Sequence, residues 1–187
     1  MQPIPRAGRF VDDEDLQEVG RLTQLRMLAF HYSQITDEGL KHLSKLRRLR
    51  GLSLKKTGIS DVGLVHVSRL TSLRVLSLQQ TSVTGVGLKH LASLKELQRL
   101  SLQSTPLDFD TLSSLAALPN LRTLDLDFIQ IDGESIDKLA RLTSLKKLSL
   151  TDISDEDLDR LRRAMPHCVI IRVRRCPDPA GYYASHY

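Results

Sequence analysis

Apolar residues recur along this chain with a period of 24 residues. Six leucines at that spacing each open the phrase Leu-x-x-Leu-x-Leu, whose first copy ends on Phe30: Leu25, Leu49, Leu73, Leu97, Leu121 and Leu145. In the first five copies an aliphatic residue follows five positions after the phrase: Ile35, Ile59, Val83, Leu107 and Ile131. Self-similarity at a period of this size indicates a chain built of stacked repeats.

Two shorter periodicities alternate inside each repeat. Leu28 and Phe30 lie two residues apart, as in a strand with one buried face, and the next apolar residues lie three apart, as on one face of a helix: Leu40, Leu43 and Leu46. The residue after the loop aliphatic is a good helix N-cap in all six repeats: Thr36, Ser60, Thr84, Asp108, Asp132 and Ser154. Each repeat is therefore predicted to fold as strand, loop and helix. Three acidic residues follow where the helix dipole favours negative charge: Asp37, Asp61 and Asp155.

These units, such as Ile35-Thr36-Asp37-Glu38-Gly39-Leu40, resemble the 24-residue class of the leucine-rich repeat family. The class occurs in bacterial tandem arrays and, more distantly, in the cysteine-containing repeats of F-box proteins. The resemblance covers residues 4 to 175 and implies an α/β fold, a right-handed solenoid with a parallel sheet on the concave face and helices on the convex face. Where many members carry Asn or Cys at the strand end, this chain has hydroxyl residues in four repeats and Ile129 in the fifth.

The ends of the chain are predicted to cap the solenoid. Residues 1–24 read as a degenerate capping repeat, because Val11 and Leu16 precede Ile35 and Leu40 by one period. Residues 25–167 contain the six repeats, and residues 168–187 a capping strand and tail. Three residues of that strand have the spacing of inward positions: Cys168, Ile171 and Val173. Two interpretations of Tyr182, Tyr183 and Tyr187 are equally good: they pack on the last repeat, or they belong to a free tail.

The outward strand positions define a candidate binding surface on the concave face. It is basic with an aromatic residue near one end, rich in amides in the middle and acidic toward the other end. The predicted contact residues are His31, Tyr32, Lys55, Lys56, Gln79, Gln103, Asp125, Asp127 and Phe128. For each residue, a solvent-exposed position with no binding role is as good an interpretation as a contact. That interpretation fits Tyr32 and Phe128 least well, because exposed aromatics are frequent interface anchors.

The excess positive charge, +5 for the chain, gathers at a second repeat position. The residue after the opening leucine is a cation in five of six repeats, with Gln98 as the exception: Arg26, Arg50, Arg74, Arg122 and Lys146. This cationic rim would suit an acidic protein or a phosphate backbone. A solvated position copied by tandem duplication is the simpler interpretation, and few aromatics are placed to stack on bases.

The sequence contains no clear catalytic or metal-binding motif. Three histidines recur at one helix position, but neighbouring helices lie about 10 Å apart, too far to share an ion: His42, His66 and His90. Gly39, Gly63 and Gly87 are explained by close approach of neighbouring helices. Cys168 is expected to be a buried thiol, and Cys176 lies among arginines. We therefore expect no metal, no cofactor and no enzymatic activity, since the predicted surface is open.

The most direct functional hypothesis is a non-enzymatic module that binds a protein or peptide on its concave sheet. The F-box resemblance implies one alternative, the substrate-recognition arm of a ubiquitin-ligase-type or other larger assembly. The cationic rim gives another, binding of a polyanion or nucleic acid. The N-terminus lacks the apolar run of a signal peptide and two cysteines suit a reducing compartment, so a cytoplasmic location with no membrane contact is expected.

Overall fold

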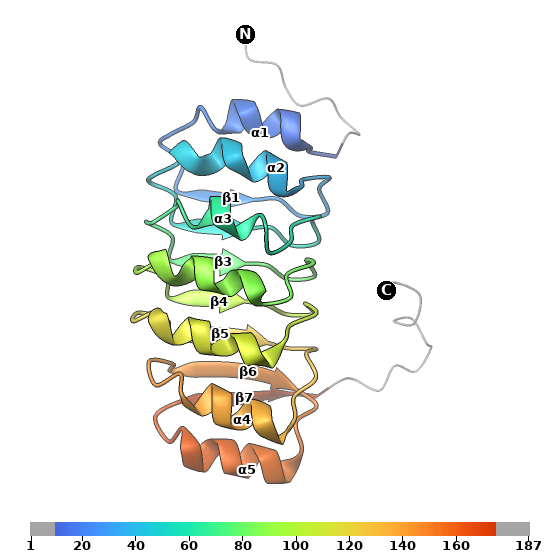
Figure 1. Cartoon of the computed structure of the whole chain (residues 1–187), viewed down its shortest axis with the longest axis vertical. Helices are drawn as coiled ribbons and strands as arrows, with labels where there is room; N and C mark the ends of the chain where they lie inside the picture. Colours follow the sequence, from blue (N-terminus) through green and yellow to red (C-terminus); the bar gives the residue numbers. More distant parts are fainter. Residues whose placement is uncertain (1–9, 175–187) are drawn as a thin grey trace, which may run out of the picture.

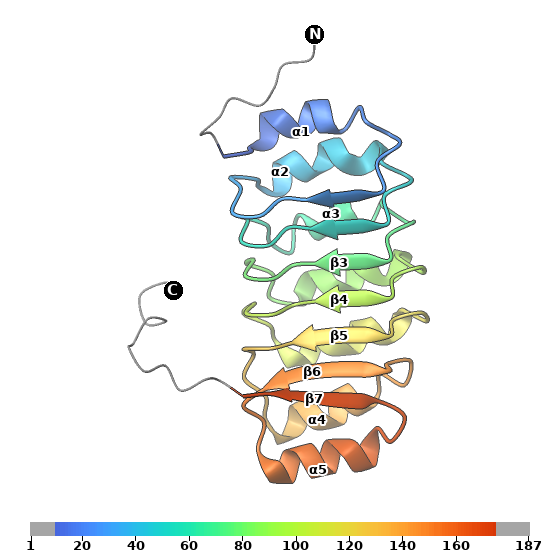
Figure 2. The ribbon, with the colours of Figure 1, turned by 180° about the vertical axis from the view of Figure 1, so that it is seen from behind.

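Seven parallel strands form one sheet in the computed structural model, which describes residues 10–174 (Figures 1 and 2). The sheet order follows the chain order. The strands are β1 (Met27–Ala29), β2 (Gly51–Ser53), β3 (Val75–Ser77), β4 (Arg99–Ser101), β5 (Thr123–Leu126), β6 (Lys147–Thr151) and β7 (Val169–Val173). Each repeat therefore contacts its sequence neighbours, as in a solenoid.

The sheet register reproduces the 24-residue period in the first six strands. Leu28 is the partner of Leu52, which in turn is the partner of Leu76. Equivalent leucines thus stack in ladders, and Leu52 and Leu76 are at most 2% exposed. The predicted inward positions of the first six strands are confirmed.

Short helical segments cover the other face of the sheet, as Figure 1 shows from the helix side and Figure 2 from the strand side. They are α1 (Asp13–Val19), α2 (Asp37–Leu40), η1 (Lys41–Lys45), α3 (Leu64–Val67), η2 (Val86–Ser93), η3 (Phe109–Ala117), α4 (Gly133–Ala140) and α5 (Asp155–Ala164). Segments η1, η2 and η3 are 3₁₀ helices, in which residues three apart eclipse one another. That geometry explains why leucines spaced by three, such as Leu88 and Leu91, are both fully buried. Within residues 10–174, no helix is long and apolar enough to cross a lipid bilayer.

Buried threonines close the loops that follow three of the strands. Thr57, Thr81 and Thr105 each donate a 2.7 Å hydrogen bond from Oγ1 to the carbonyl oxygen three residues earlier. In the next repeat Ile129 packs into the core at 6% exposure, and its N–H still donates to the Leu126 carbonyl oxygen at 3.3 Å. The turn is therefore retained at Ile129 without the hydroxyl hydrogen bond that the threonines make.

Only three of the six predicted N-cap residues cap a helix through their side chains. Asp108, Asp132 and Ser154 accept hydrogen bonds from N–H groups in the first turns of η3, α4 and α5. Thr36 is the N-cap of α2, as predicted, but its side chain makes no cap hydrogen bond. The prediction is wrong for Ser60 and Thr84, because α3 and η2 begin after Gly63 and Gly85. A contact between repeats occupies these hydroxyls instead.

An aspartate of each early repeat binds the next repeat. The carboxylates of Asp13 and Asp61 accept from the hydroxyls of Thr36 and Thr84 at 2.6 and 2.5 Å. A Cβ added at Gly39 would collide with the Asp13 carboxylate. The predicted close approach is confirmed at Gly39, Gly63 and Gly87. The approaching group is the aspartate carboxylate of the preceding repeat at the first two glycines and the Cα, Cβ and carbonyl oxygen of Asp61 at Gly87.

The capping strand differs from the sequence prediction by one residue. Ile170 and Arg172 oppose the inward Leu148 and Leu150, so the inward assignment of Ile171 and Val173 was wrong. Cys168 precedes β7 and is only partly buried, which corrects its expected place inside the strand. Because β7 carries no further described strand over it, an arginine is tolerated inward there, where it reaches Asp155 of α5. Cys176 and the three tail tyrosines lie outside the described residues.

Candidate protein-binding surface

Backbone hydrogen bonds bring the predicted contact residues side by side on the concave face. The N–H of Tyr32 donates to the Lys55 carbonyl oxygen at 3.1 Å, and the N–H of Lys56 to that of Gln79 at 2.9 Å. The same ladder continues through Gln80, whose N–H donates to Gln103, and through Ser104, whose N–H donates to Asp127. One row of the face, next to the strand ends, is therefore His31, Lys55, Gln79, Gln103 and Asp127.

The residue that ends each strand segment has left-handed backbone geometry. Its φ lies between 53° and 59° at Tyr32, Lys56, Gln80, Ser104, Phe128 and Asp152. Residues other than glycine rarely adopt this conformation, and here the repeated turn imposes it six times. The turn holds two aromatic side chains at the edge of the face, with Tyr32 56% and Phe128 40% exposed. Lys56 Nζ lies 4.7 Å from the centroid of the Tyr32 ring, within cation–π distance.

Serines on the floor of the face join several predicted contact residues into hydrogen-bonded groups. His31 Nε2 lies 2.9 Å from Ser53 Oγ. Gln79 Nε2 donates to Ser101 Oγ at 2.9 Å, and that hydroxyl donates to the Asp125 carboxylate at 3.0 Å. These bonds fix the orientation of polar groups that a partner would meet.

A pair of carboxylates forms the acidic part of the face. Ser149 Oγ donates to Asp127 at 2.9 Å and Thr151 Oγ1 at 3.3 Å. Partial burial raises the pKa of Asp127, and the negative charge of Asp125 raises it further, against the lowering effect of these hydroxyl bonds. Negative charge is therefore concentrated but partly shielded here.

The opposite end of the face has an apolar hollow that was not among the predicted contacts. Met27 is 65% and Val75 38% exposed, with Gly51 between them. The Met27 thioether lies across Gly51, where a Cβ would occupy the same space. Leu28, Ala29, Leu52, Ser53 and Ser77 complete the lining. The alternation of residues along a strand predicts that Met27 and Val75 face outward. The sequence carries no signal, however, that the Met27 side chain lies over Gly51 of the next strand.

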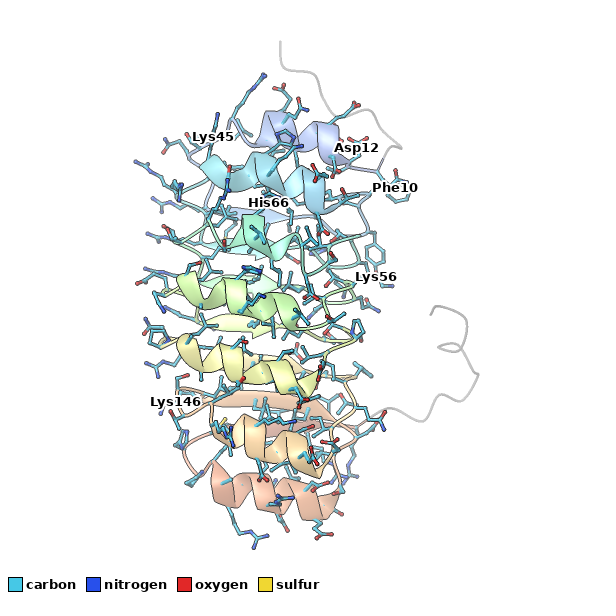
Figure 3. All side chains as sticks on the ribbon, viewed as in Figure 1. Phe10, Asp12, Lys45, Lys56, His66 and Lys146 are labelled. Carbon is cyan, nitrogen blue, oxygen red and sulfur yellow. The ribbon has the colours of Figure 1, made fainter. Side chains whose placement is uncertain are left out.

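The cationic rim is a continuous row at the start of the strands. The N–H of Arg50 donates to the Arg26 carbonyl oxygen at 2.7 Å, and that of Arg74 to Arg50 at 2.8 Å. The row continues through Gln98 to Arg122 and Lys146. All its side chains are exposed, and Figure 3 shows Lys146 on the edge opposite Lys56. Within residues 10–174, the only ion pair in the rim is Arg74 with Glu96 at 3.8 Å.

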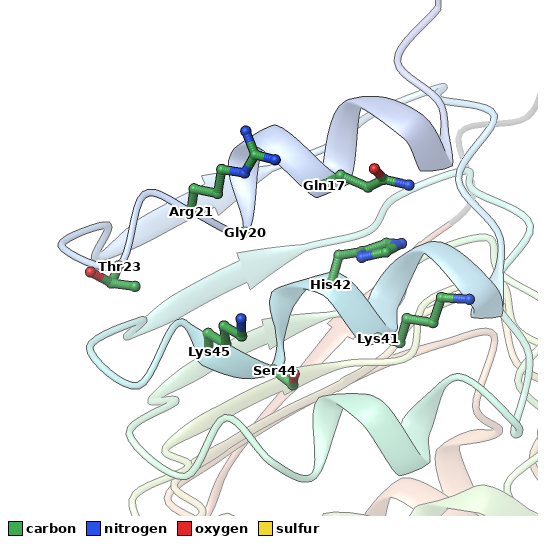
Figure 4. A pocket seen from close by; sticks show the side chains of 8 residues that line it. All are labelled: Gln17, Gly20, Arg21, Thr23, Lys41, His42, Ser44 and Lys45. Atoms are coloured by element: carbon green, nitrogen blue, oxygen red, sulfur yellow. The ribbon is translucent and has the colours of Figure 1, made fainter.

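A second depression lies away from the sheet, between α1 and the α2–η1 segment (Figure 4). It is lined by Gln17, Gly20, Arg21, Thr23, Lys41, His42, Ser44 and Lys45. Arg21 and Lys41 pair with Glu18 and Glu38, so two of its four basic side chains are neutralised locally. Across residues 10–174, no three His, Cys, Asp or Glu side chains lie close enough to hold a metal ion together.

Comparison with known proteins supports the fold. An internalin, InlF, from Listeria monocytogenes matches with a TM-score of 0.62 and 21% identity, over 92% of this chain and 55% of the internalin chain. The structure of a TLR13–ssRNA13 complex matches with a TM-score of 0.57 and 21% identity, over 88% of this chain and 27% of that one. The chain thus spans about half of the first protein and about a quarter of the second. A search of curated protein sequences gives no significant match.

Both structural likenesses are too low in identity to carry more than the fold. The sequence profile of a leucine-rich repeat region, however, matches residues 7–172, nearly the whole chain. That match reaches all seven strands of the sheet. The chain belongs to the leucine-rich repeat family, whose members are in general non-enzymatic protein-interaction modules.

Proposed function

We propose that the concave face binds a protein or peptide segment and that the nine predicted contact residues line this interface. The sheet supplies a rigid platform, because each strand is hydrogen-bonded into a seven-stranded array. Serine hydroxyls and the left-handed turns hold the polar and aromatic side chains in place. A partner therefore meets a preorganised surface, which lowers the entropy lost on association.

The observation that carries this proposal is the exposure of two aromatic side chains at equivalent turns. Tyr32 and Phe128 are four repeats apart and retain 56% and 40% exposure. Both residues occupy the left-handed turn that ends a strand segment, at the edge of the face. Aromatic side chains in such positions dominate binding energy when a partner covers them.

Affinity capture from a lysate of the source cells tests the proposal at about 0.15 M and about 0.5 M salt. The immobilised wild-type chain is compared with a Tyr32→Ala, Phe128→Ala double variant. A matched control is Val62→Ala, Val86→Ala, which removes side chains that are 64% and 57% exposed beside α3 and in η2. We expect that a protein from the lysate is captured by the wild-type chain and by the control at both salt concentrations, and that the double variant does not capture it. Equal capture by all three proteins would contradict the proposal.

The continuous cationic rim favours a second candidate, binding of a polyanion. Its test replaces Arg26, Arg50 and Arg74 by glutamine and measures binding of a single-stranded RNA against salt concentration. Phosphate contacts release counterions, so affinity falls steeply with salt and each lost contact reduces the slope. Nucleic acid captured only at low salt, with the aromatic variant unaffected, would favour this candidate over the concave face.

A further inference from the structure

The first four strand segments carry positive charge without any acidic residue. Segments 26–32, 50–56, 74–80 and 98–104 contain no Asp or Glu and six Lys or Arg residues. Acidic residues on the concave face begin at Asp125, in the fifth segment. The N-terminal half of the face is therefore a positive region, and the acidic pair lies outside it.

An apolar strip runs through the middle of this positive region. Met27, Gly51 and Val75 occupy one register position of β1, β2 and β3. The next outward position holds the small side chains of Ala29, Ser53 and Ser77, so the hollow stays open above Leu28 and Leu52. Methionine adapts its shape easily, which suits it to receive a partner's aliphatic or aromatic side chain.

Cations flank the strip at both ends of the strands. Arg26, Arg50 and Arg74 lie just before β1, β2 and β3, whereas Lys55 and Lys56 follow β2. Among the described residues, neither lysine forms an ion pair, and Arg26 and Arg50 form none either. The distance from residue 50 to residue 55 along an extended chain is about 16 Å, or roughly five residues of a bound strand.

Resting on the proposed function, we infer that the N-terminal half of the concave face recognises an acidic polypeptide segment with an apolar side chain between carboxylates. The apolar side chain fills the hollow at Met27 and Val75. The carboxylates reach the arginines on one flank and the lysines on the other, where guanidinium groups suit bidentate contacts. Nucleic acid fits this half less well, because Tyr32 is the only exposed aromatic in the four segments and bases need stacking partners.

A random peptide library displayed on phage is the probe for this inference. Peptides enriched on the wild-type chain are sequenced, synthesised with a fluorescent label and titrated by fluorescence polarisation. We expect enriched peptides with Asp or Glu on both sides of a large apolar residue. Exchange of their carboxylates for amides, or of the apolar residue for alanine, should weaken binding about tenfold or more, a difference of about 1.4 kcal/mol.

Paired variants of the chain locate the contact. Arg50→Gln, Lys55→Gln removes one cation from each flank, and Met27→Ser, Val75→Ser removes the apolar strip. The matched control is Lys146→Gln, Lys147→Gln, two exposed cations at the other end of the sheet. We expect about tenfold losses for the first two variants and less than about twofold for the control, with the charge variant converging on wild type at high salt.

The outcomes separate this inference from the proposed function. Enriched peptides that are neutral or basic, yet lose binding with Tyr32→Ala, Phe128→Ala, would overturn the acidic specificity and leave the concave face as a binding surface. Peptides insensitive to every concave variant, or no enrichment over an empty display, would contradict both. Enrichment of acidic peptides whose binding the Lys146→Gln, Lys147→Gln variant abolishes would move the site to the C-terminal end of the sheet and overturn the inference.

Discussion

The carboxylate of Asp37 accepts two hydrogen bonds from Ser60, one from its N–H at 2.9 Å and one from its hydroxyl at 2.5 Å. The two residues belong to successive repeats and lie 23 positions apart. Gly63 leaves the space that this carboxylate occupies, because a Cβ there would collide with Asp37 Oδ1. The contact joins one repeat to the next on the side away from the strands.

Removal of this carboxylate should loosen the stack. We expect Asp37→Ala to lower the free energy of unfolding by about 1–3 kcal/mol, since hydrogen bonds to a charged acceptor contribute in that range. Urea denaturation followed by circular dichroism measures the change. The neighbouring Glu38→Ala is the control, because Glu38 pairs only with Lys41 at the surface. Equal stability of Asp37→Ala and wild type would show that the contact contributes nothing in solution.

A charge in the leucine ladder should unfold the middle of the solenoid. Leu76 is 1% exposed and lies between Leu52 and Leu100, so Leu76→Asp places an unpaired carboxylate in the core at a cost of several kcal/mol. Ser77→Asp, one residue on and outward, should change stability little. Thermal melts of both variants compare the two faces of β3. An unchanged melt for Leu76→Asp would refute the inward register.

The left-handed turns predict an unusual tolerance of glycine. Gln80 has a φ of 53°, whereas its neighbour Gln79 is bonded to Ser101. Gln80→Gly relieves about 1 kcal/mol of backbone strain, which offsets the entropy that glycine loses on folding. We expect Gln80→Gly to be neutral or stabilising and Gln79→Gly to be destabilising by about 1 kcal/mol. Chemical denaturation of both variants checks the order, and the reverse order would contradict it.

Because the pKa of Asp127 is raised, replacing its carboxylate by an amide should increase the free energy of unfolding by an amount that depends on pH. An acid whose pKa is higher in the folded than in the unfolded state costs stability once the pH rises above both values, and costs none below the unfolded value, 3.8 for Asp. Asp127→Asn removes the charge and keeps an acceptor for Ser149. We expect this variant to be more stable than wild type near neutral pH and the gain to vanish as the pH falls toward 3.8.

Denaturation of Asp127→Asn and wild type across this pH range measures the difference. The control is Glu134→Gln, which exchanges an exposed acid of α4 for its amide. A gain that stays constant with pH would contradict the role of the Asp127 charge.

The sequence alone determined the repeat, the inward leucines and the placement of the predicted contact residues on one face. The reason is local: alternation along a strand decides which side a residue faces, and a strict 24-residue spacing repeats that decision in each unit. The rows that hold Lys55 beside Gln79, and Arg26 beside Arg50, follow from the period. The threonines at strand ends were predictable on the same grounds.

Only the tertiary structure decided the contacts that cross between repeats or depend on the end of the stack. The pairing of Asp37 with Ser60 depends on how far one repeat is offset from the next. Met27 can lie over Gly51 because this residue of the neighbouring strand has no side chain. The register of β7 escaped prediction because the final unit has only one packed side among the described residues, so its apolar pattern is less constrained. The 24-residue period thus determines which residues of each repeat face inward, whereas packing between repeats determines the side-chain contacts that join them and the register of the last strand.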